Sequence, residues 1–233
     1  MKAVVIKNQQ ETPNVKIMRI KPESSYSFKP GQFINISHKI KKEGKEIEVK
    51  RPYSIASSPT NKEYLELAFD IKENGMVSPY LYNLKKDDEI EISQPLGFFT
   101  FEDDIKEGIV LIGAGTGITP LMGILRHVTE KSLKNNITLI YSCKTKKDVI
   151  YHKELKRIEK LNNKFSYHIT LTQDNEWNGL KGHIDLAMVK EVIQEIENKL
   201  FFLCGPPRMV LDLSKILQDA GVKKSSIKIE GYD

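Results

Sequence analysis

The second half of the chain alternates short apolar segments with segments of helical spacing, and this pattern limits the fold more than any other feature. The apolar segments lie at residues 109–112, 137–141, 167–172, 200–204 and 227–229. Short apolar runs are typical of parallel strands buried on both faces. The helical spacing lies between most of them, at 120–131, 151–161, 186–198 and 206–220. The pattern predicts a doubly wound α/β domain with a five-stranded parallel sheet.

The first hundred residues follow a different pattern, with β-rich runs and almost no helix between them. The runs lie at 3–6, 15–20, 33–37, 47–50, 53–56, 64–71 and 89–93. One helix is expected, with Ser78 as its cap, Pro79 at its first position and Leu84 near its end. Short strands separated by turns predict a small antiparallel β-barrel. We therefore expect two domains, at residues 1–102 and 103–233.

A glycine-rich segment, GAGTGITP at residues 113–120, joins the first apolar run to the first helix of the α/β half. Glycines at such a turn let the backbone approach a pyrophosphate, whose charge faces the N–H groups of the helix. The segment departs from the common dinucleotide fingerprint, because Ile118 stands in place of a third glycine. Taken alone, it fits a tight turn without a ligand equally well.

A second motif, CGPP at residues 204–207, follows the fourth apolar run. In a doubly wound sheet the first and fourth strands commonly flank the point where the strand order reverses, and ligands bind there. The two motifs should therefore meet at one crevice. By itself, Cys204 is equally well explained as a small core residue.

A third motif, RPYSIASSP at residues 51–59, precedes both of these in the chain. In this order the three motifs resemble the ferredoxin–NADP reductase superfamily, flavoproteins that take a hydride from a nicotinamide and pass electrons onward. The resemblance runs from KPGQF at 29–33 to EGY at 230–232. It implies that the barrel binds a flavin and that the α/β domain binds NAD(P).

The resemblance also implies roles for individual residues. Arg51 would pair with a flavin phosphate, for which a guanidinium is well shaped. Tyr53 would stack on the flavin ring, and Ser54 would hydrogen-bond near its hydride-accepting nitrogen. The turn at residues 75–78 would offer free N–H groups to a phosphate. The implied flavin-binding residues are Arg51, Pro52, Tyr53, Ser54, Phe69, Gly75, Met76, Val77 and Ser78.

The resemblance implies further roles for residues of the α/β half. Cys204 would lie against the nicotinamide, Glu230 would tune the site and relay protons, and Tyr232 would cover the flavin. A frayed polar tail is the alternative reading of the C-terminal residues. The implied catalytic residues are Ser54, Cys204, Glu230 and Tyr232. The implied nucleotide-binding residues are Gly113, Gly115, Thr116, Gly117, Thr119, Pro120, Thr172, Gln173, Cys204, Gly205 and Pro206.

The motifs also bear on the choice of cofactors. The turn at 75–78 resembles that of FAD-binding members, so FAD is favoured over FMN. NADP-preferring relatives end the third strand of this domain with a Ser-Arg pair, whereas this chain has Thr172, Gln173 and Asp174 there. That difference favours NADH as hydride donor, although Lys144, Lys146 or Lys181 could serve a 2′-phosphate.

The implied function is hydride transfer from NAD(P)H to FAD, followed by electron transfer to an external carrier such as a ferredoxin, a flavodoxin or an oxygenase component. The two cysteines, Cys143 and Cys204, are too few for an iron–sulfur cluster, so the acceptor must be another molecule. Two alternatives stay open: a free-flavin NAD(P)H reductase, and a non-catalytic electron-transfer subunit of a larger complex.

Composition excludes some other classes. The net charge of +5 is too small to indicate nucleic acid as a partner. The five histidines are scattered without ligand spacing, so no metal site is expected. No apolar run is long enough to span a bilayer, and no signal-peptide pattern follows Met1. We expect a cytoplasmic protein without a membrane span.

Overall fold

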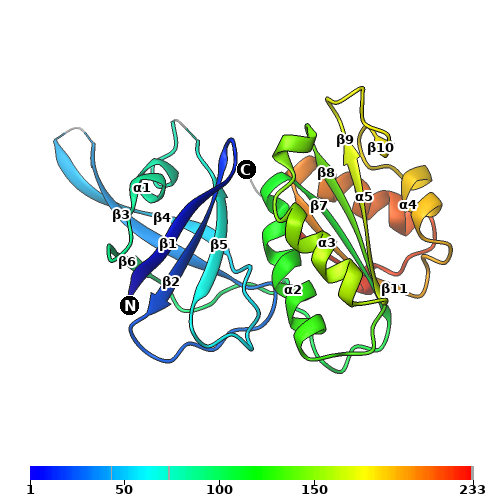
Figure 1. Ribbon diagram of the computed structural model, residues 1–233, viewed down its shortest axis with the longest axis horizontal. Helices are drawn as coiled ribbons and strands as arrows, with labels where there is room; N and C mark the ends of the chain where they lie inside the picture. Colours follow the sequence, from blue (N-terminus) through cyan, green and yellow to red (C-terminus); the bar gives the residue numbers. More distant parts are fainter. Residues whose placement is uncertain (43, 73, 232–233) are drawn as a thin grey trace.

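The computed structural model describes residues 1–42, 44–72 and 74–231, and Figure 1 shows a strand-rich half beside an α/β half. The first half contains six strands. They are β1 (Lys2–Thr12), β2 (Val15–Pro22), β3 (Phe33–Lys42), β4 (Lys45–Ser54), β5 (Leu65–Asp70) and β6 (Glu89–Ile92). They pair in the order β4-β3-β6-β1-β2-β5, and every pairing is antiparallel.

Strand β4 differs from the sequence expectation, which placed two strands at 47–50 and 53–56. A single strand pairs with β3 along its whole length, with Pro52 opposite Asn35. Proline has no N–H, but β4 lies at an end of the sheet order, where one side of the strand needs no donor. Beyond it, the Ile55 N–H donates to Gln32 O and the Ala56 N–H to Glu66 O, so the chain bridges from β3 to β5 and closes the barrel.

Helix α1 (Ser78–Asn83) is present where expected, but the expectation that Ser78 caps it is wrong. Val77 holds the cap position, where no side chain makes a capping hydrogen bond. The Ser78 hydroxyl instead accepts the backbone N–H of Lys72 at 3.0 Å. Its hydrogen bond therefore fixes the loop before the helix rather than the first turn of the helix.

The second half is a parallel sheet with the order β10-β9-β8-β7-β11-β12. The strands are β7 (Gly108–Ala114), β8 (Ile137–Cys143), β9 (Phe165–Leu171), β10 (Leu180–Lys181), β11 (Lys199–Gly205) and β12 (Ile227–Gly231). The five predicted strands are confirmed, and the two-residue β10 adds a sixth at the edge. As expected for a doubly wound sheet, β7 and β11 are neighbours at the reversal of strand order.

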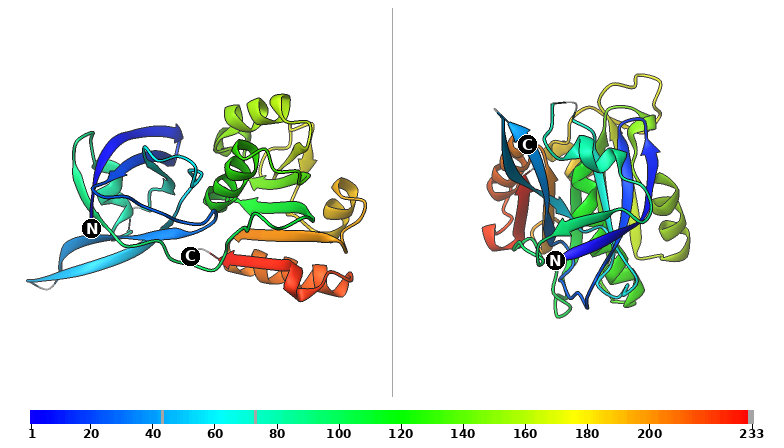
Figure 2. Two further views of the ribbon diagram at one scale, coloured as in Figure 1. Left: turned by 90° about the horizontal axis from the view of Figure 1, so that it is seen from below. Right: turned by 90° about the vertical axis from the view of Figure 1, so that its left-hand side faces the viewer.

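Four helices cover the two faces of this sheet: α2 (Ile118–Glu130), α3 (His152–Leu161), α4 (Leu186–Val192) and α5 (Pro207–Asp219). Figure 2 shows α2 and α3 on one face and α5 on the other. Helix α4 ends well before the predicted residue 198, because Ile193 is extended and both Ile193 and Ile196 turn into the core with Val189. Within the described ranges, no helix is long and apolar enough to cross a membrane.

The two halves share a core along α2. The cluster on the α2 face of the parallel sheet also contains Val15, Ile17 and Ala68 of the barrel. At Gly123 of α2, an added Cβ would lie 2.6 Å from Ile55 O, so the helix touches the barrel backbone directly. This contact sets how the barrel meets the ends of the parallel strands. The predicted boundary at residue 102 lies between β6 and β7 and stays a prediction.

Candidate active site

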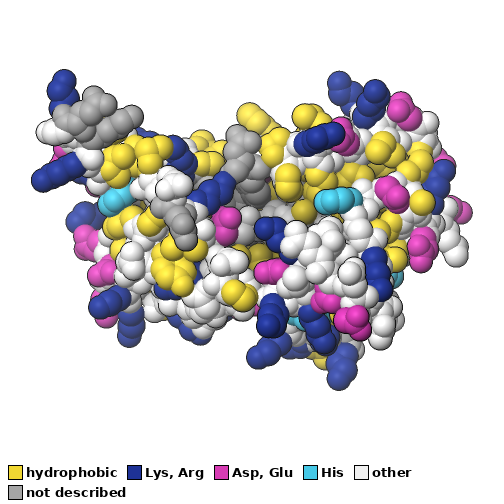
Figure 3. Space-filling view, turned by 90° about the horizontal axis from the view of Figure 1, so that it is seen from above, with side chains coloured by type: hydrophobic (Ala, Val, Ile, Leu, Met, Phe, Trp, Pro, Cys, Tyr) yellow, Lys and Arg dark blue, Asp and Glu magenta, His cyan; other side chains and the backbone are white. Residues whose placement is uncertain are grey.

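Three residues singled out from the sequence lie side by side at the carboxyl ends of adjacent parallel strands. Gly113 of β7 pairs with Cys204 of β11, and Cys204 pairs with Glu230 of β12. The Cys204 side chain is fully buried, and Glu230 is half-buried. These three residues, Gly113, Cys204 and Glu230, form a row across the sheet. The row lies at the reversal of strand order, where open α/β sheets bind their ligands. Figure 3 views the molecule from above, and both charged and apolar side chains occur on the two halves of this face.

The two glycine motifs converge as the sequence predicted. A Cβ added to Gly117 would lie 2.3 Å from Cys204 O and 2.9 Å from the Cα of Gly205. Only glycine allows the turn at 115–117 to approach the end of β11 so closely. Thr119 and Pro120 are buried behind this turn, whereas Pro206 is exposed beside it. The two motifs thus form one surface from two loops.

Tyr141 of β8 holds the glycine turn, and the sequence analysis did not identify it. Its hydroxyl donates to Gly115 O at 2.9 Å, and the Thr119 hydroxyl donates to Thr116 O at 2.6 Å. Burial raises the pKa of Tyr141 well above its usual value, so the phenol stays protonated and remains a donor. The only signal in the sequence is a tyrosine near the carboxyl end of a buried strand.

One hydrogen bond joins the barrel to this row. Ser54, the last residue of β4, donates from Oγ to Oε1 of Glu230 at 3.2 Å. The Ser54 side chain is nearly fully buried. Residues separated by most of the chain therefore meet at one point, and the predicted grouping of Ser54, Cys204 and Glu230 is present in the structure.

The remaining residues of the β4 motif line the barrel beside Ser54. Tyr53 is half-buried and meets Phe69 edge to face, with ring centroids 6.0 Å apart. Burial raises the pKa of the Tyr53 phenol above its usual value. Arg51 and Pro52 are exposed, and Arg51 donates to Lys50 O at 2.8 Å. The guanidinium thus lies at the surface, where an anion can reach it.

The turn at 75–78 is so tight that position 75 must be glycine. The Gly75 N–H donates to Lys72 O at 2.7 Å, and a Cβ on Gly75 would lie 2.8 Å from both Lys72 O and Ser78 Oγ. Met76 is exposed and Val77 is buried in the barrel core. In α1, which follows the turn, Tyr80 stacks on His38 of β3 at 3.8 Å. The turn therefore lies beside the β3–β4 hairpin that carries Arg51.

Other predicted residues lie after β9, which β8 separates from the row. The N–H groups of Thr172 and Gln173 donate to Cys143 O and Lys144 O, which fixes this segment beside the end of β8. Lys181 donates one of its three N–H groups to Asn175 O at 2.8 Å. Tyr232 lies outside the described residues. In the described part of the chain, no group of three His, Cys, Asp or Glu side chains could hold a metal ion.

A buried ion cluster fixes the two halves together, and the sequence analysis did not identify it. Arg126 of α2 donates to Glu66 of β5 at 2.8 Å and to Glu154 of α3 at 2.7 Å, and it also reaches Ala56 O. Glu66 receives a second bond from Arg19 at 2.7 Å. Burial alone would raise the pKa of Glu66, but Arg126 and Arg19 together lower it. Glu66 is therefore a carboxylate at neutral pH.

A dinucleotide and a flavin fit the residues present. Gly115 has φ +53°, and a Cβ added there would meet nothing within 4 Å, so the glycine turn faces open space. The turn leads into α2, whose first N–H groups suit a diphosphate. Gly113, Gly115, Thr116 and Gly117 would hold the nucleotide, while Arg51, Tyr53, Ser54 and the turn at 75–78 would hold the flavin.

Comparisons with known proteins identify the same two kinds of domain. An oxidoreductase FAD-binding domain model matches residues 2–101, and an oxidoreductase NAD-binding domain model matches residues 111–215. The FAD/NAD-binding domain of a nitric oxide dioxygenase from Vibrio cholerae superposes with a TM-score of 0.87, at 27% identity over 99% of this chain and 98% of that one. The chain belongs to the ferredoxin–NADP reductase superfamily of NAD(P)H-dependent flavoprotein reductases.

The curated relatives include further reductases. The glycine betaine monooxygenase reductase subunit of Pseudomonas aeruginosa is 28% identical over 89% of this chain, which spans only 57% of that protein. Ferredoxin–NADP reductase B of Sorangium cellulosum is 28% identical over 90% of this chain, which spans 87% of that protein. The chain thus spans little more than half the length of the monooxygenase reductase.

Gly115→Ala tests whether a nucleotide occupies the open space at the turn. The new methyl group meets no protein atom, so stability should fall only by the left-handed backbone cost of about 1–2 kcal/mol. If the nucleotide lies there, the Kd for NADH should rise at least about fivefold, because one methyl group of overlap costs about 1 kcal/mol or more. Titration calorimetry and thermal unfolding measure the two effects.

The matched control for this change is Gly44→Ala. Gly44 also has positive φ (+76°) with nothing near its Cβ, but it lies in the β3–β4 hairpin. It should lose similar stability and keep the NADH affinity. Equal NADH affinity in both variants would show that the nucleotide does not bind against Gly115.

Proposed function

We propose that this protein takes a hydride from NAD(P)H onto bound FAD and passes the electrons to an external carrier. The observation that carries the proposal is the Ser54–Glu230 hydrogen bond, which joins the flavin motif of the barrel to the row that contains Gly113 and Cys204. A bound flavin supplies the redox chemistry by accepting two electrons together and releasing them singly. The protein supplies position, hydrogen bonds and exclusion of water.

The chain's own residues divide this work between the two halves. The glycine turn binds the diphosphate of the dinucleotide, and Tyr141 keeps that turn in place. The buried Cys204 forms the floor between the turn and Glu230. The Ser54 hydroxyl hydrogen-bonds to the carboxylate of Glu230 and would offer a bound flavin a polar contact. We propose residues 1–102 as the flavin domain and 103–233 as the nucleotide domain.

We propose FAD rather than FMN as the flavin and NADH rather than NADPH as the hydride donor. Support for NADH comes from the segment after β9, where Thr172 and Gln173 are held to the end of β8 and Asp174 follows them. An acidic side chain there repels a 2′-phosphate. Lys181, one alternative contact for that phosphate, is held by Asn175 O.

For the acceptor, we propose a soluble protein carrier of the ferredoxin or flavodoxin type, or an oxygenase component. The monooxygenase reductase and ferredoxin reductase among the relatives support such a partner. Gel filtration of the flavin-loaded protein separates this from the free-flavin alternative. A retained, stoichiometric flavin that NADH bleaches at one equivalent supports the proposal. Loss of the flavin on the column would favour a free-flavin reductase, and a retained flavin that NADH leaves oxidised would favour a non-catalytic subunit.

Ser54→Ala tests the role of the barrel in the reaction. The variant loses a hydroxyl that contacts a carboxylate, an interaction of about 1.5–3 kcal/mol. The rate of flavin reduction by NADH should therefore fall about 10- to 100-fold. Stopped-flow absorbance under anaerobic conditions measures this rate at saturating NADH.

Ser57→Ala is the control for that experiment. Ser57 lies in the same segment, but its hydroxyl accepts the Glu66 N–H inside the barrel and touches no residue of the row. It should reduce the flavin at nearly the normal rate. Equal rates in the two variants would remove Ser54 from the proposed site.

A further inference from the structure

An open cavity of about 610 Å³ lies on the outer surface of the barrel, lined by residues of β1, β2 and the loop before β5. Its charged lining consists of Lys7, Arg19, Lys21, Lys62 and Glu63. Four cations and one acid give this small region a formal charge of +3, a large part of the +5 carried by the whole chain. None of these residues belongs to the row at the ends of the parallel strands.

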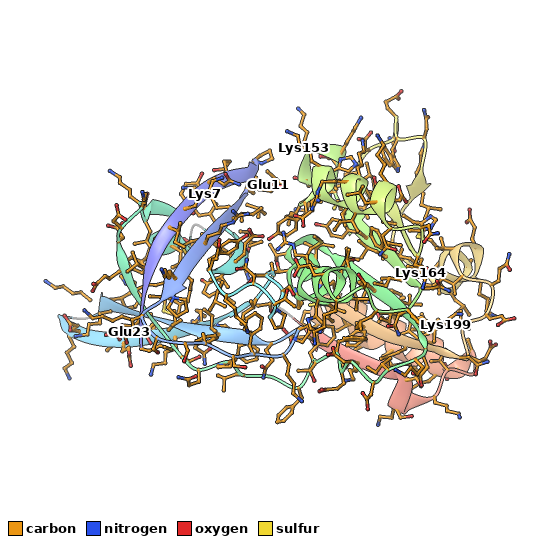
Figure 4. All side chains as sticks on the ribbon, turned by 60° about the horizontal axis from the view of Figure 1, so that its bottom comes forward. Lys7, Glu11, Glu23, Lys153, Lys164 and Lys199 are labelled. Carbon is orange, nitrogen blue, oxygen red and sulfur yellow. The ribbon has the colours of Figure 1, made fainter. Side chains whose placement is uncertain are left out.

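Strand geometry directs three of the cations to the same side of the barrel. Lys7 is paired with Arg19 across β1 and β2, at a register shift that leaves Ile6 as an extra residue. Such bulges redirect side chains. Arg19 and Lys21 are two positions apart on β2, so they share a face. Figure 4 shows Lys7 on β1.

Arg19 is held in a fixed orientation within this cavity. Its Nε donates to the buried carboxylate of Glu66 at 2.7 Å, and its guanidinium carbon lies 4.4 Å from the ring centroid of Tyr64. Neither Nη nitrogen has a hydrogen-bond partner among the described residues. A guanidinium immobilised in this way presents two adjacent donors, which suits the oxygens of a phosphate.

The three lysines of the cavity form no ion pair among the described residues. Lys7, Lys21 and Lys62 are exposed, and in the ranges that the structure describes none of them pairs with a carboxylate. By contrast, Lys2 and Lys39 elsewhere on the barrel pair with Glu89 and Glu46. Cations gathered without partners raise the local potential, which an anionic ligand would lower.

We propose that this cavity binds a small molecule bearing a diphosphate group, at a site separate from the flavin and nucleotide site. Arg19 supplies the fixed double donor, and Lys7, Lys21 and Lys62 supply the surrounding charge. The ligand would therefore contact Arg19, which hydrogen-bonds to Glu66. Because Glu66 binds Arg126 of α2, one carboxylate links the cavity to the interface between the two halves.

Inorganic pyrophosphate is the probe that tests this. The flavin-loaded protein, saturated with NAD⁺ to block the glycine turn, is titrated by calorimetry at constant ionic strength. We expect saturable binding with one site, and amide shifts at Lys7 and Tyr64 in a nitrogen-correlation spectrum. Lys7→Gln combined with Lys21→Gln should weaken binding at least about tenfold, because both removed charges lie beside the ligand.

Two further variants make the test decisive. Lys85→Gln combined with Lys86→Gln removes the same charge from an exposed segment elsewhere on the barrel and should change the Kd less than twofold. Arg19→Lys keeps the charge and loses the double donor, so it should weaken binding by an intermediate factor. The absence of saturable binding to the NAD⁺-saturated protein, or equal weakening by the two double variants, would overturn the proposal. The experiment measures pyrophosphate binding and involves no hydride transfer. A negative result would therefore leave the proposed reductase function intact.

Discussion

Arg126→Met is expected to lower the free energy of unfolding by about 3–5 kcal/mol, since it removes one partner of a buried ion pair. The side chains of Arg126 and Glu66 are only 12% and 2% exposed. Without Arg126, the Glu66 carboxylate keeps Arg19 but loses the cation that reaches it from α2. Urea unfolding at neutral pH measures the change. The same variant should also slow flavin reduction, because α2 carries the glycine turn at its start and meets the barrel through this cluster.

The pH dependence of the stability loss in Arg126→Met identifies its cause. The folded pKa of Glu66 is lowered, so its stabilising contribution is present above the ordinary carboxyl pKa of about 4.3 and is lost as the pH falls through the folded value. The difference between wild type and Arg126→Met should therefore shrink at acidic pH.

Arg157→Met is the matched control, because Arg157 is exposed on α3 and has no ion-pair partner among the described residues. Its effect should stay within about 0.5 kcal/mol. A loss of stability in Arg126→Met that is equally small, or that is unchanged between pH 7 and a pH well below the ordinary carboxyl pKa of about 4.3, would contradict the proposed role of the ion cluster.

Gly117→Ala is expected to slow flavin reduction by about 100-fold. The new Cβ would lie 2.3 Å from Cys204 O, so either the glycine turn or the end of β11 must move. The three nearest atoms, O and C of Cys204 and Cα of Gly205, all belong to backbone, which cannot rotate away as a side chain can. A displacement of about 1 Å at a site that aligns two reactants costs on the order of 10²-fold in rate. The barrel is untouched by this clash, so flavin should still bind.

Gly108→Ala is the control for this change. Gly108 begins strand β7, which leads into the glycine turn, and lies at the opposite end of the parallel strands. The atoms nearest to its added Cβ would belong to the flexible side chain of Lys199, the first of them at 3.0 Å. Figure 4 marks Lys199, in the half of the molecule away from the barrel. Stopped-flow rates and flavin titrations should show near-normal behaviour. If Gly117→Ala reduces its flavin as fast as Gly108→Ala, the close approach of the two motifs does not matter to the reaction.

Local pattern predicted much of this protein. Short apolar runs and helical spacing located the five main parallel strands, because burial on both faces favours apolar residues in them. The order of strands and the two glycine motifs then placed Gly113 and Cys204 side by side. The resemblance to the reductase superfamily connected Ser54 with Glu230, which no local pattern relates.

Tertiary structure decided the remainder. Two predicted strands became one at β4, because pairing with β3 overrode the break that Pro52 suggested. The Ser78 hydroxyl was taken by the Lys72 N–H rather than by the helix, because both groups belong to the same tight loop. The Arg126 cluster and the basic cavity join residues from separate strands and helices. The sequence alone determined which segments become strands and which turns need glycine, whereas only the packed chain determined which charges meet, because such contacts depend on how the two halves pack together.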